Sequence, residues 1–127
     1  MNKTLTKIII DTNALLALIE YNIDFISELQ RILDIPYKIC ILAATKDEFE
    51  KLKQTESLKI RRRIMLIESL IPKLKIEILP DQGYVDEILI NYSLQHNLIL
   101  TQDQALKQKL QRPYLTIRQQ KKIIIVQ

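Results

Sequence analysis

The stretch KIIIDTNALL, residues Lys7–Leu16, decides the fold of this chain. Three isoleucines after Lys7 are typical of a short buried strand, and a helical pattern begins directly after Asp11. A charge at the end of a buried strand needs polar partners, so packing alone does not explain Asp11. The stretch therefore predicts a strand, a carboxylate and a helix in direct succession.

A second stretch repeats this arrangement later in the chain. The apolar run Leu98–Thr101 leads into Asp103 and then into a helical pattern. The carboxyl ends of parallel strands meet at one edge of a sheet, where α/β folds place their ligands. We therefore expect Asp11 and Asp103 to lie at the same edge.

The remaining segments alternate between strand and helix patterns. Strands are expected at Thr6–Ile10, Tyr37–Ala43, Lys75–Leu79, Leu98–Thr101, Tyr114–Ile117 and Lys121–Val126. Helices are expected at Asn13–Tyr21, Asp24–Leu33, Ser57–Leu70 (closed by Pro72), Val85–His96 and Gln104–Gln111, with one more that starts at Thr45 as its N-cap. This alternation predicts an α/β fold, a three-layer α/β/α sandwich with a central, mostly parallel sheet.

Composition narrows the class of protein. With 127 residues and 47% hydrophobic residues, the chain is expected to form a single domain over residues 1–127. One cysteine (Cys40, expected in the core) and one histidine (His96) cannot form a conventional zinc site. A single glycine, Gly83, excludes a glycine-rich phosphate loop. Without an apolar run of about 20 residues or a secretion signal at Met1–Thr4, a soluble cytoplasmic protein is expected.

Basic residues are concentrated in one part of the chain. The formal net charge is +4. The segment from Lys51 to Lys75 contains eight lysines and arginines but only two acids, Glu56 and Glu68. Such a segment suits a polyanionic partner. A solvated helix face explains it equally well.

Four acids occupy comparable places in the expected architecture: Asp11, Glu48, Asp86 and Asp103. Each of three acids also has a purely structural explanation. Asp103 could cap a helix, Asp86 could be stabilised by the positive end of a helix dipole, and Glu48 could complete a capping box with Thr45. Together they would repel one another unless a cation neutralised them. Carboxylate oxygens favour Mg²⁺ or Mn²⁺, which can activate water against a phosphodiester. Acidic cluster and basic flank together indicate a metal-dependent nuclease.

The same segments resemble the motifs of PIN-domain ribonucleases. Ile8–Leu15 resembles the opening of these proteins, Glu48–Leu52 their second acidic motif, Tyr84–Leu89 the third and Leu100–Lys107 the fourth. The tail Ile117–Ile123 is similar to that of an archaeal branch, which resembles both VapC-type toxins and the PIN nucleases of pre-ribosomal RNA processing. The resemblance implies an endoribonuclease for single-stranded or structured RNA that depends on Mg²⁺ or Mn²⁺, and a homodimer.

On this resemblance, each acid has an expected role. Asp11 and Asp103 would ligate the metal, Asp86 would do so directly or through water, and Glu48 would orient or deprotonate the attacking water. Glu87 is the alternative to Asp86. As supporting residues, Asn13 would hold Asp11 through its amide, and Thr101 would hydrogen-bond a carboxylate or a metal water. The candidates for contact with the RNA backbone are Arg61, Arg62, Arg63, Arg118, Lys121 and Lys122.

The chain departs from the family pattern at Ala105, where relatives often carry a further acid. This departure favours the alternative of a catalytically weak RNA-binding component of a larger assembly. A nucleotide-binding or phosphatase-like domain and a receiver domain are further alternatives. The expected partners are RNA and either an antitoxin or a pre-ribosomal particle, with no membrane. An apolar surface at Phe25, Ile26 and Leu29 is the candidate dimer interface, although burial within the chain explains it equally well.

Overall fold

The computed structural model describes residues 5–127; Met1–Thr4, on which the expected absence of a secretion signal depends, lies outside them. The strands are β1 (Thr6–Ile10), β2 (Tyr37–Leu42), β3 (Glu77–Leu79), β4 (Leu98–Leu100), β5 (Tyr114–Arg118) and β6 (Lys122–Val126). The helices are α1 (Thr12–Glu20), α2 (Phe25–Ile32), α3 (Ala43–Thr55), α4 (Leu58–Lys73), α5 (Val85–Leu94) and α6 (Gln104–Lys109).

The strands form one sheet in the order β3-β2-β1-β4-β5-β6, in which only β6 runs antiparallel to its neighbour. β1 lies between β2 and β4, with Ile8 opposite both Ile39 and Leu98. Ile8, Ile9 and Ile10 are fully buried, as a strand covered on both faces requires. The stretch Lys7–Leu16 therefore contains a central strand of the sheet, β1, and the start of the helix that follows it.

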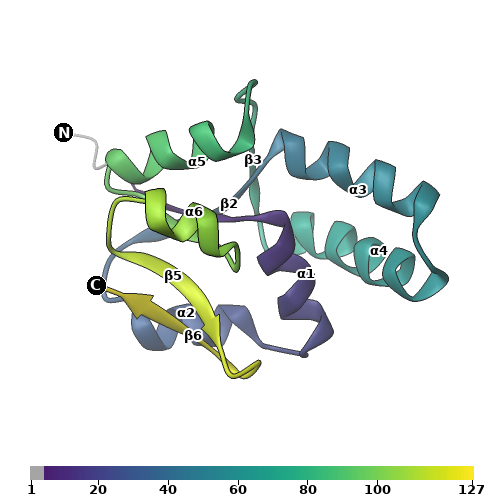
Figure 1. The fold of residues 1–127 in the computed structure, drawn as a ribbon. Coiled ribbons are helices and arrows are strands. Elements are labelled where there is room, and N and C mark those ends of the chain that lie inside the picture. The colour runs from purple at the N-terminus through teal and green to yellow at the C-terminus, as the bar shows by residue number, and fades with distance from the viewer. Residues whose placement is uncertain (1–4) are drawn as a thin grey trace.

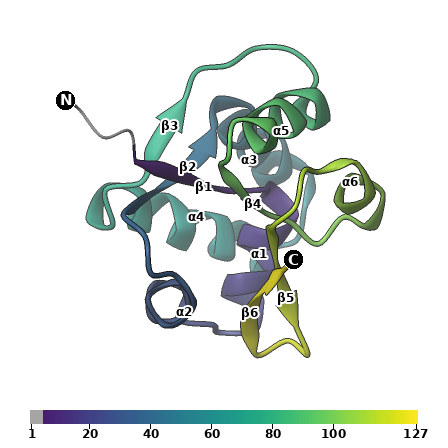
Figure 2. The ribbon, with the colours of Figure 1, turned by 90° about the vertical axis from the view of Figure 1, so that its left-hand side faces the viewer.

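Helices cover both faces of the sheet (Figures 1 and 2). Ile8 and Ile10 pack in one cluster with side chains of α1, α2, α3 and α4, whereas Ile9 packs in a second cluster with side chains of α5 and α6. This alternation along β1 follows from the two-residue period of a strand. The predicted three-layer sandwich is confirmed. Cys40 is buried in the second cluster, and this burial raises the pKa of its thiol to about 12.

Several helix boundaries differ from those expected by one to three residues, and two of these differences change the role of a residue. α3 begins at Ala43, two residues before Thr45, and its N-cap Leu42 provides no side-chain hydrogen bond. The capping box predicted at Thr45 is therefore wrong. Pro72 lies inside α4 rather than beyond its end. A proline in the last turn removes only one backbone hydrogen bond, so the helix continues to Lys73.

The candidate dimer surface on α2 is occupied within the chain. Phe25 and Leu29 are buried, and Ile26 packs against the same core cluster. The alternative given for these residues, burial within the chain, is therefore correct. No helix within residues 5–127 combines the length and the hydrophobicity required to cross a bilayer.

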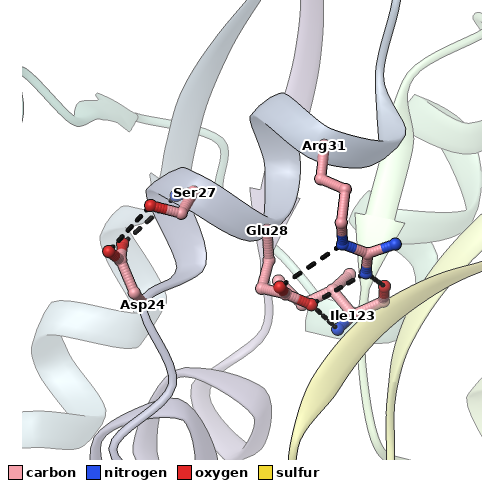
Figure 3. A network of polar contacts seen from close by, with 5 residues as sticks. All are labelled: Asp24, Ser27, Glu28, Arg31 and Ile123. Carbon is pink, nitrogen blue, oxygen red and sulfur yellow. Dashed lines mark hydrogen bonds and ion pairs between the residues drawn. The ribbon is translucent and has the colours of Figure 1, made fainter.

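Side chains of α2 also fasten the helix to β6 (Figure 3). The Glu28 carboxylate accepts a hydrogen bond from the Ile123 backbone N–H at 2.9 Å, and the Arg31 guanidinium donates one to the Ile123 carbonyl at 3.1 Å. Glu28 and Arg31 also form an ion pair at 2.9 Å. The hydrogen bond from Arg31 is the main cause that lowers the pKa of Glu28. Two hydrogen bonds to Ile123 thus join segments that are more than 90 residues apart, and the ion pair within α2 holds their two side chains together.

We expect Glu28→Ala to lower the free energy of unfolding by about 1–3 kcal/mol, because it leaves the Ile123 N–H and Arg31 without their acceptor. Urea unfolding followed by circular dichroism measures the change. Gln30→Ala, on the exposed side of the same helix, is the matched control and should stay within about 0.5 kcal/mol of the wild type. Equal stability of the two variants would show that the contacts to Ile123 contribute nothing.

Candidate active site

Asp11 stands where β1 passes into α1. It is the N-cap of α1, and its Oδ1 accepts a hydrogen bond from the Thr12 backbone N–H at 2.9 Å. Its Oδ2 accepts one from the Thr101 hydroxyl, also at 2.9 Å. Its own backbone N–H donates to the Leu100 carbonyl at the end of β4. The carboxylate is therefore fixed between the ends of two adjacent strands.

The Thr101 hydroxyl joins Asp11 to the fourth acidic motif. While it donates to Asp11, it accepts a hydrogen bond from the Asp103 backbone N–H at 3.1 Å. Thr101 is fully buried, so this hydroxyl does not exchange partners freely with water. The expected hydrogen bond from Thr101 to a carboxylate is therefore present, and it goes to Asp11.

Asp103 is the N-cap of α6, because its Oδ1 accepts a hydrogen bond from the Leu106 backbone N–H at 3.1 Å. The interpretation of Asp103 as a helix cap is thus correct. Its Oδ2 accepts no hydrogen bond within residues 5–127, so one oxygen stays available for a ligand. Capping and ligand binding are compatible for a carboxylate that uses a different oxygen for each.

Asp86 and Glu48 complete the group of acids. Burial is the main cause that raises the pKa of Asp11; the hydrogen bonds from Thr101 and Thr12 lower it, and the charges of Asp86 and Asp103 raise it. Desolvation and then the charge of Asp11 raise the pKa of Glu48, against a lowering by Lys51. The charges of Asp86 and Asp103 therefore act on Asp11, and the charge of Asp11 acts on Glu48. Glu87 is not among the groups that shift the pKa of Asp11.

A buried contact between two threonines sets the position of Glu48. The Thr12 hydroxyl donates to the Thr45 hydroxyl at 3.0 Å, and both residues are buried. Thr12 follows Asp11, and Thr45 lies one turn before Glu48 on α3. The contact thus holds the start of α1 against the start of α3. The sequence around Thr45 predicts a helix cap and contains no signal for this contact with Thr12.

The expected contact between the Asn13 amide and Asp11 is not formed within residues 5–127. Instead, the Asn13 Oδ1 accepts a hydrogen bond from the Gln102 backbone N–H at 3.2 Å. The Gln102 side-chain oxygen in turn accepts from the Thr116 hydroxyl and the Ile117 N–H, both at 2.8 Å. These contacts link α1, the turn after β4 and the end of β5. Asn13 therefore fixes the turn that carries Asp103 rather than the carboxylate of Asp11.

The basic candidates fall in two places. Arg118, Lys121 and Lys122 are exposed on the β5–β6 hairpin, where the Gln120 amide donates a hydrogen bond to the hydroxyl of Tyr21, at the opposite end of α1 from Asp11. The other three lie on α4. Of these, Arg61 and Arg62 are exposed, whereas Arg63 is half-buried and pairs with Glu20 of α1 at 3.8 Å. The structure therefore gives Arg63 a partner inside the molecule.

The acidic edge fits a hard divalent cation by the chemistry of its donors. All four acids supply oxygen, and the raised pKa values of Asp11 and Glu48 mark a place where added positive charge would be favourable. Within residues 5–127, no three acidic, histidine or cysteine side chains are arranged to hold one metal ion together. Mg²⁺ is commonly held by one or two carboxylates, with water in its other positions.

A mostly parallel sheet with carboxylates at its carboxyl edge is an arrangement in which α/β proteins bind their ligands. The chain belongs to the PIN-like domain family, whose model matches residues 8–120. It is 32% identical over 122 residues to ribonuclease VapC4 of Methanocaldococcus jannaschii, a match that covers 91% of this chain and 92% of the relative. The solved structure of the PIN domain endonuclease Utp24 superposes with a TM-score of 0.72 at 26% identity, covering 94% of this chain and 90% of the other.

The raised pKa of Asp11 has a measurable consequence for stability. Because ionisation of this buried carboxylate is costlier in the folded than in the unfolded state, the protein should lose stability as pH rises above the unfolded value of about 3.9. Asp11→Asn removes this dependence. We therefore expect the free energy of unfolding of the wild type, relative to Asp11→Asn, to fall with rising pH in EDTA.

Urea unfolding at a series of pH values from about 4 to 7 measures this difference. Asp34→Asn, a like substitution at an exposed position between α2 and β2, controls for the loss of one negative charge. A difference between wild type and Asp11→Asn that rises with pH would contradict a raised pKa.

Proposed function

We propose that this protein is a metal-dependent endoribonuclease that hydrolyses phosphodiester bonds of single-stranded or structured RNA. The observation that carries the proposal is the position of Asp11 at the end of β1, where burial and the charges of Asp86 and Asp103 raise its pKa, and where its own charge raises the pKa of Glu48. The ribonuclease VapC4 and the endonuclease Utp24 support it, because the similarity to both spans nearly the whole chain.

Asp11 and Asp103 are the proposed metal ligands, with Asp86 acting directly or through water. When bound, Mg²⁺ or Mn²⁺ would supply positive charge that neutralises the scissile phosphate and activates water for attack. Thr101 and Thr12 fix both oxygens of Asp11, while Asp103 keeps one oxygen free of hydrogen bonds from residues 5–127. The two carboxylates are thus held in place before any ligand binds, which reduces the reorganisation that binding requires.

Glu48 is the proposed general base that orients and deprotonates the attacking water. It is exposed on the first turns of α3, and desolvation and the charge of Asp11 raise its pKa. A raised pKa brings a carboxylate closer to the range in which it can both accept and release a proton near neutral pH. The contact between Thr12 and Thr45 fixes the helix that carries it.

The basic hairpin is the proposed first contact for the RNA backbone. Arg118, Lys121 and Lys122 are exposed and would supply the positive charge that phosphates attract. Arg61 and Arg62, which are exposed on α4, are further candidates for contact with the RNA backbone. Arg63 is the weakest candidate of the six, since it pairs with Glu20.

RNA is the proposed substrate, and an antitoxin or a pre-ribosomal particle is the proposed protein partner, as the family resemblance implies. A homodimer stays a prediction, and its interface must differ from the buried surface of α2. Identification of the RNA that is cut in cells distinguishes the toxin role from the processing role. The second candidate function, a catalytically weak RNA-binding component, is favoured by Ala105 at the place of a further acid.

Cleavage of single-stranded RNA in the presence of Mn²⁺ tests the proposal. We expect wild-type cleavage that EDTA abolishes, and a loss of about 100-fold or more in rate for Asp11→Asn and Glu48→Gln. Asp47→Asn is the matched control for Glu48→Gln, because Asp47 is an exposed acid next to it on the same helix. RNA binding without metal-dependent cleavage would favour the second candidate function. Equal rates for wild type and Asp11→Asn would overturn the assigned site.

Thr101→Val tests whether the buried hydroxyl positions Asp11. The valine keeps the shape of the side chain but removes the hydrogen bond that lowers the pKa of Asp11. We expect about 10–100-fold weaker apparent Mn²⁺ affinity or activity. The acidic limb of the pH–rate profile should move to higher pH, because Asp11 must ionise to bind metal.

Thr101→Ser restores the hydroxyl and should return both the Mn²⁺ dependence and the pH profile toward wild type. A Thr101→Val enzyme with an unshifted pH profile would show that the hydroxyl has no role in positioning Asp11.

A further inference from the structure

An open pocket lies beside the acidic edge, between α5 and α6. Its volume is about 490 Å³, and it is lined by Tyr84, Val85, Asp86, Glu87, Ile90 and Lys109. Asp86 is shared with the proposed active site, where its charge acts on Asp11. An occupant of this pocket would therefore contact a residue of the proposed active site.

Tyr84 is a highly exposed aromatic side chain of the pocket, and no contact within residues 5–127 explains its exposure. It is 78% exposed, the largest fraction among the exposed large hydrophobic residues of the described chain. It precedes α5 as the N-cap residue but contributes no side-chain cap, and its hydroxyl makes no hydrogen bond within residues 5–127. An exposed aromatic ring with neither packing nor a hydrogen bond is a candidate contact for a ligand.

The backbone before Tyr84 is built to present this ring. Gly83, the only glycine of the chain, has φ +125°, a conformation that L side chains rarely adopt. The preceding loop is tied to α5 because the Tyr92 hydroxyl donates a hydrogen bond to Asp81. Tyr84 is thus held by a fixed turn on one side and by the start of a helix on the other.

The lining of the pocket favours a nucleobase over a phosphate. Tyr84, Val85 and Ile90 offer one aromatic and two apolar surfaces, whereas Asp86 and Glu87 repel anions. The acids can accept hydrogen bonds from the exocyclic amino group of a base. Lys109, on the α6 side of the pocket, makes no ion pair within the described chain and could contact a phosphate of the RNA backbone. A flat ring with polar edges matches these surfaces.

We propose that this pocket binds one unpaired nucleobase of the substrate, stacked on Tyr84, next to the scissile phosphate. The inference rests on the proposed endoribonuclease function and adds to it a requirement for an unstacked base at one position. Because every base has a face that can stack, Tyr84 would select single-stranded over duplex RNA more strongly than it selects sequence.

Tyr84→Trp tests binding without cleavage. The chain contains no tryptophan, so this variant carries a single fluorescent reporter at the pocket. In EDTA, we expect saturable quenching of its emission by a single-stranded RNA oligonucleotide, and none by inorganic phosphate or by a duplex of the same sequence. RNA binding seen by fluorescence anisotropy without any change in tryptophan emission would overturn the proposal, as would quenching only by a protein partner.

Cleavage of a single-stranded RNA tests the role in catalysis. We expect Tyr84→Ala to raise KM by about 5- to 150-fold, the effect of one lost base-stacking contact, and Tyr84→Phe to stay close to wild type. Leu94→Ala is the matched control, because Leu94 is an exposed apolar residue at the other end of α5. In a series of substrates that each carry one abasic nucleotide, we expect the wild-type KM to rise when the abasic nucleotide is at one particular position. For Tyr84→Ala, that abasic substrate should have the same KM as the intact one.

The two proposals fail in different ways. If the wild type cuts no RNA, the proposed function is wrong. Quenching of the tryptophan emission of Tyr84→Trp by single-stranded RNA still decides whether the pocket binds a base. If the wild type cuts RNA and Tyr84→Ala has the same KM and the same abasic pattern, only the base-binding pocket is wrong.

Discussion

The arrangement of the candidate site depends on one buried hydroxyl. Thr101 donates to the Asp11 carboxylate and accepts from the Asp103 N–H, so it uses its donor and one lone pair to join two motifs that are 90 residues apart. Because it is fully buried, water cannot substitute for either partner. The neighbouring contacts, from Thr12 to Thr45 and from Asn13 to Gln102, extend the same principle to α3 and β5. Side-chain hydrogen bonds at the strand ends therefore position the acids.

These hydrogen bonds oppose an unfavourable electrostatic arrangement. Burial and the charges of Asp86 and Asp103 raise the pKa of Asp11, and only the contacts with Thr101 and Thr12 lower it. A site of this kind is destabilised when all of its acids are ionised, and it gains most from a cation that enters it. Local strain of this kind, with perturbed carboxylates beside one another, is a common property of functional sites.

The sequence determines the fold and the edge at which the acids meet, because strand ends follow directly from apolar runs such as Ile8–Ile10. It does not determine which side chains hold those acids. Thr45 follows a strand and precedes Glu48, so a capping box is the natural interpretation; only the earlier start of α3 turns its hydroxyl inward to Thr12. Likewise, the partner of Asn13 depends on the turn at Gln102, a contact across 89 residues that no local pattern contains.

The contacts of α2 with Ile123 have a consequence for how the sheet ends. β6 is the last strand, and an unpaired strand edge can template the addition of another chain. At Ile123, one acceptor from Glu28 and one donor from Arg31 take the places that a seventh strand would fill. The hairpin that carries Lys121 and Lys122 can therefore face a polyanion while its outer backbone is withheld, at this residue, from β-augmentation by a neighbouring molecule.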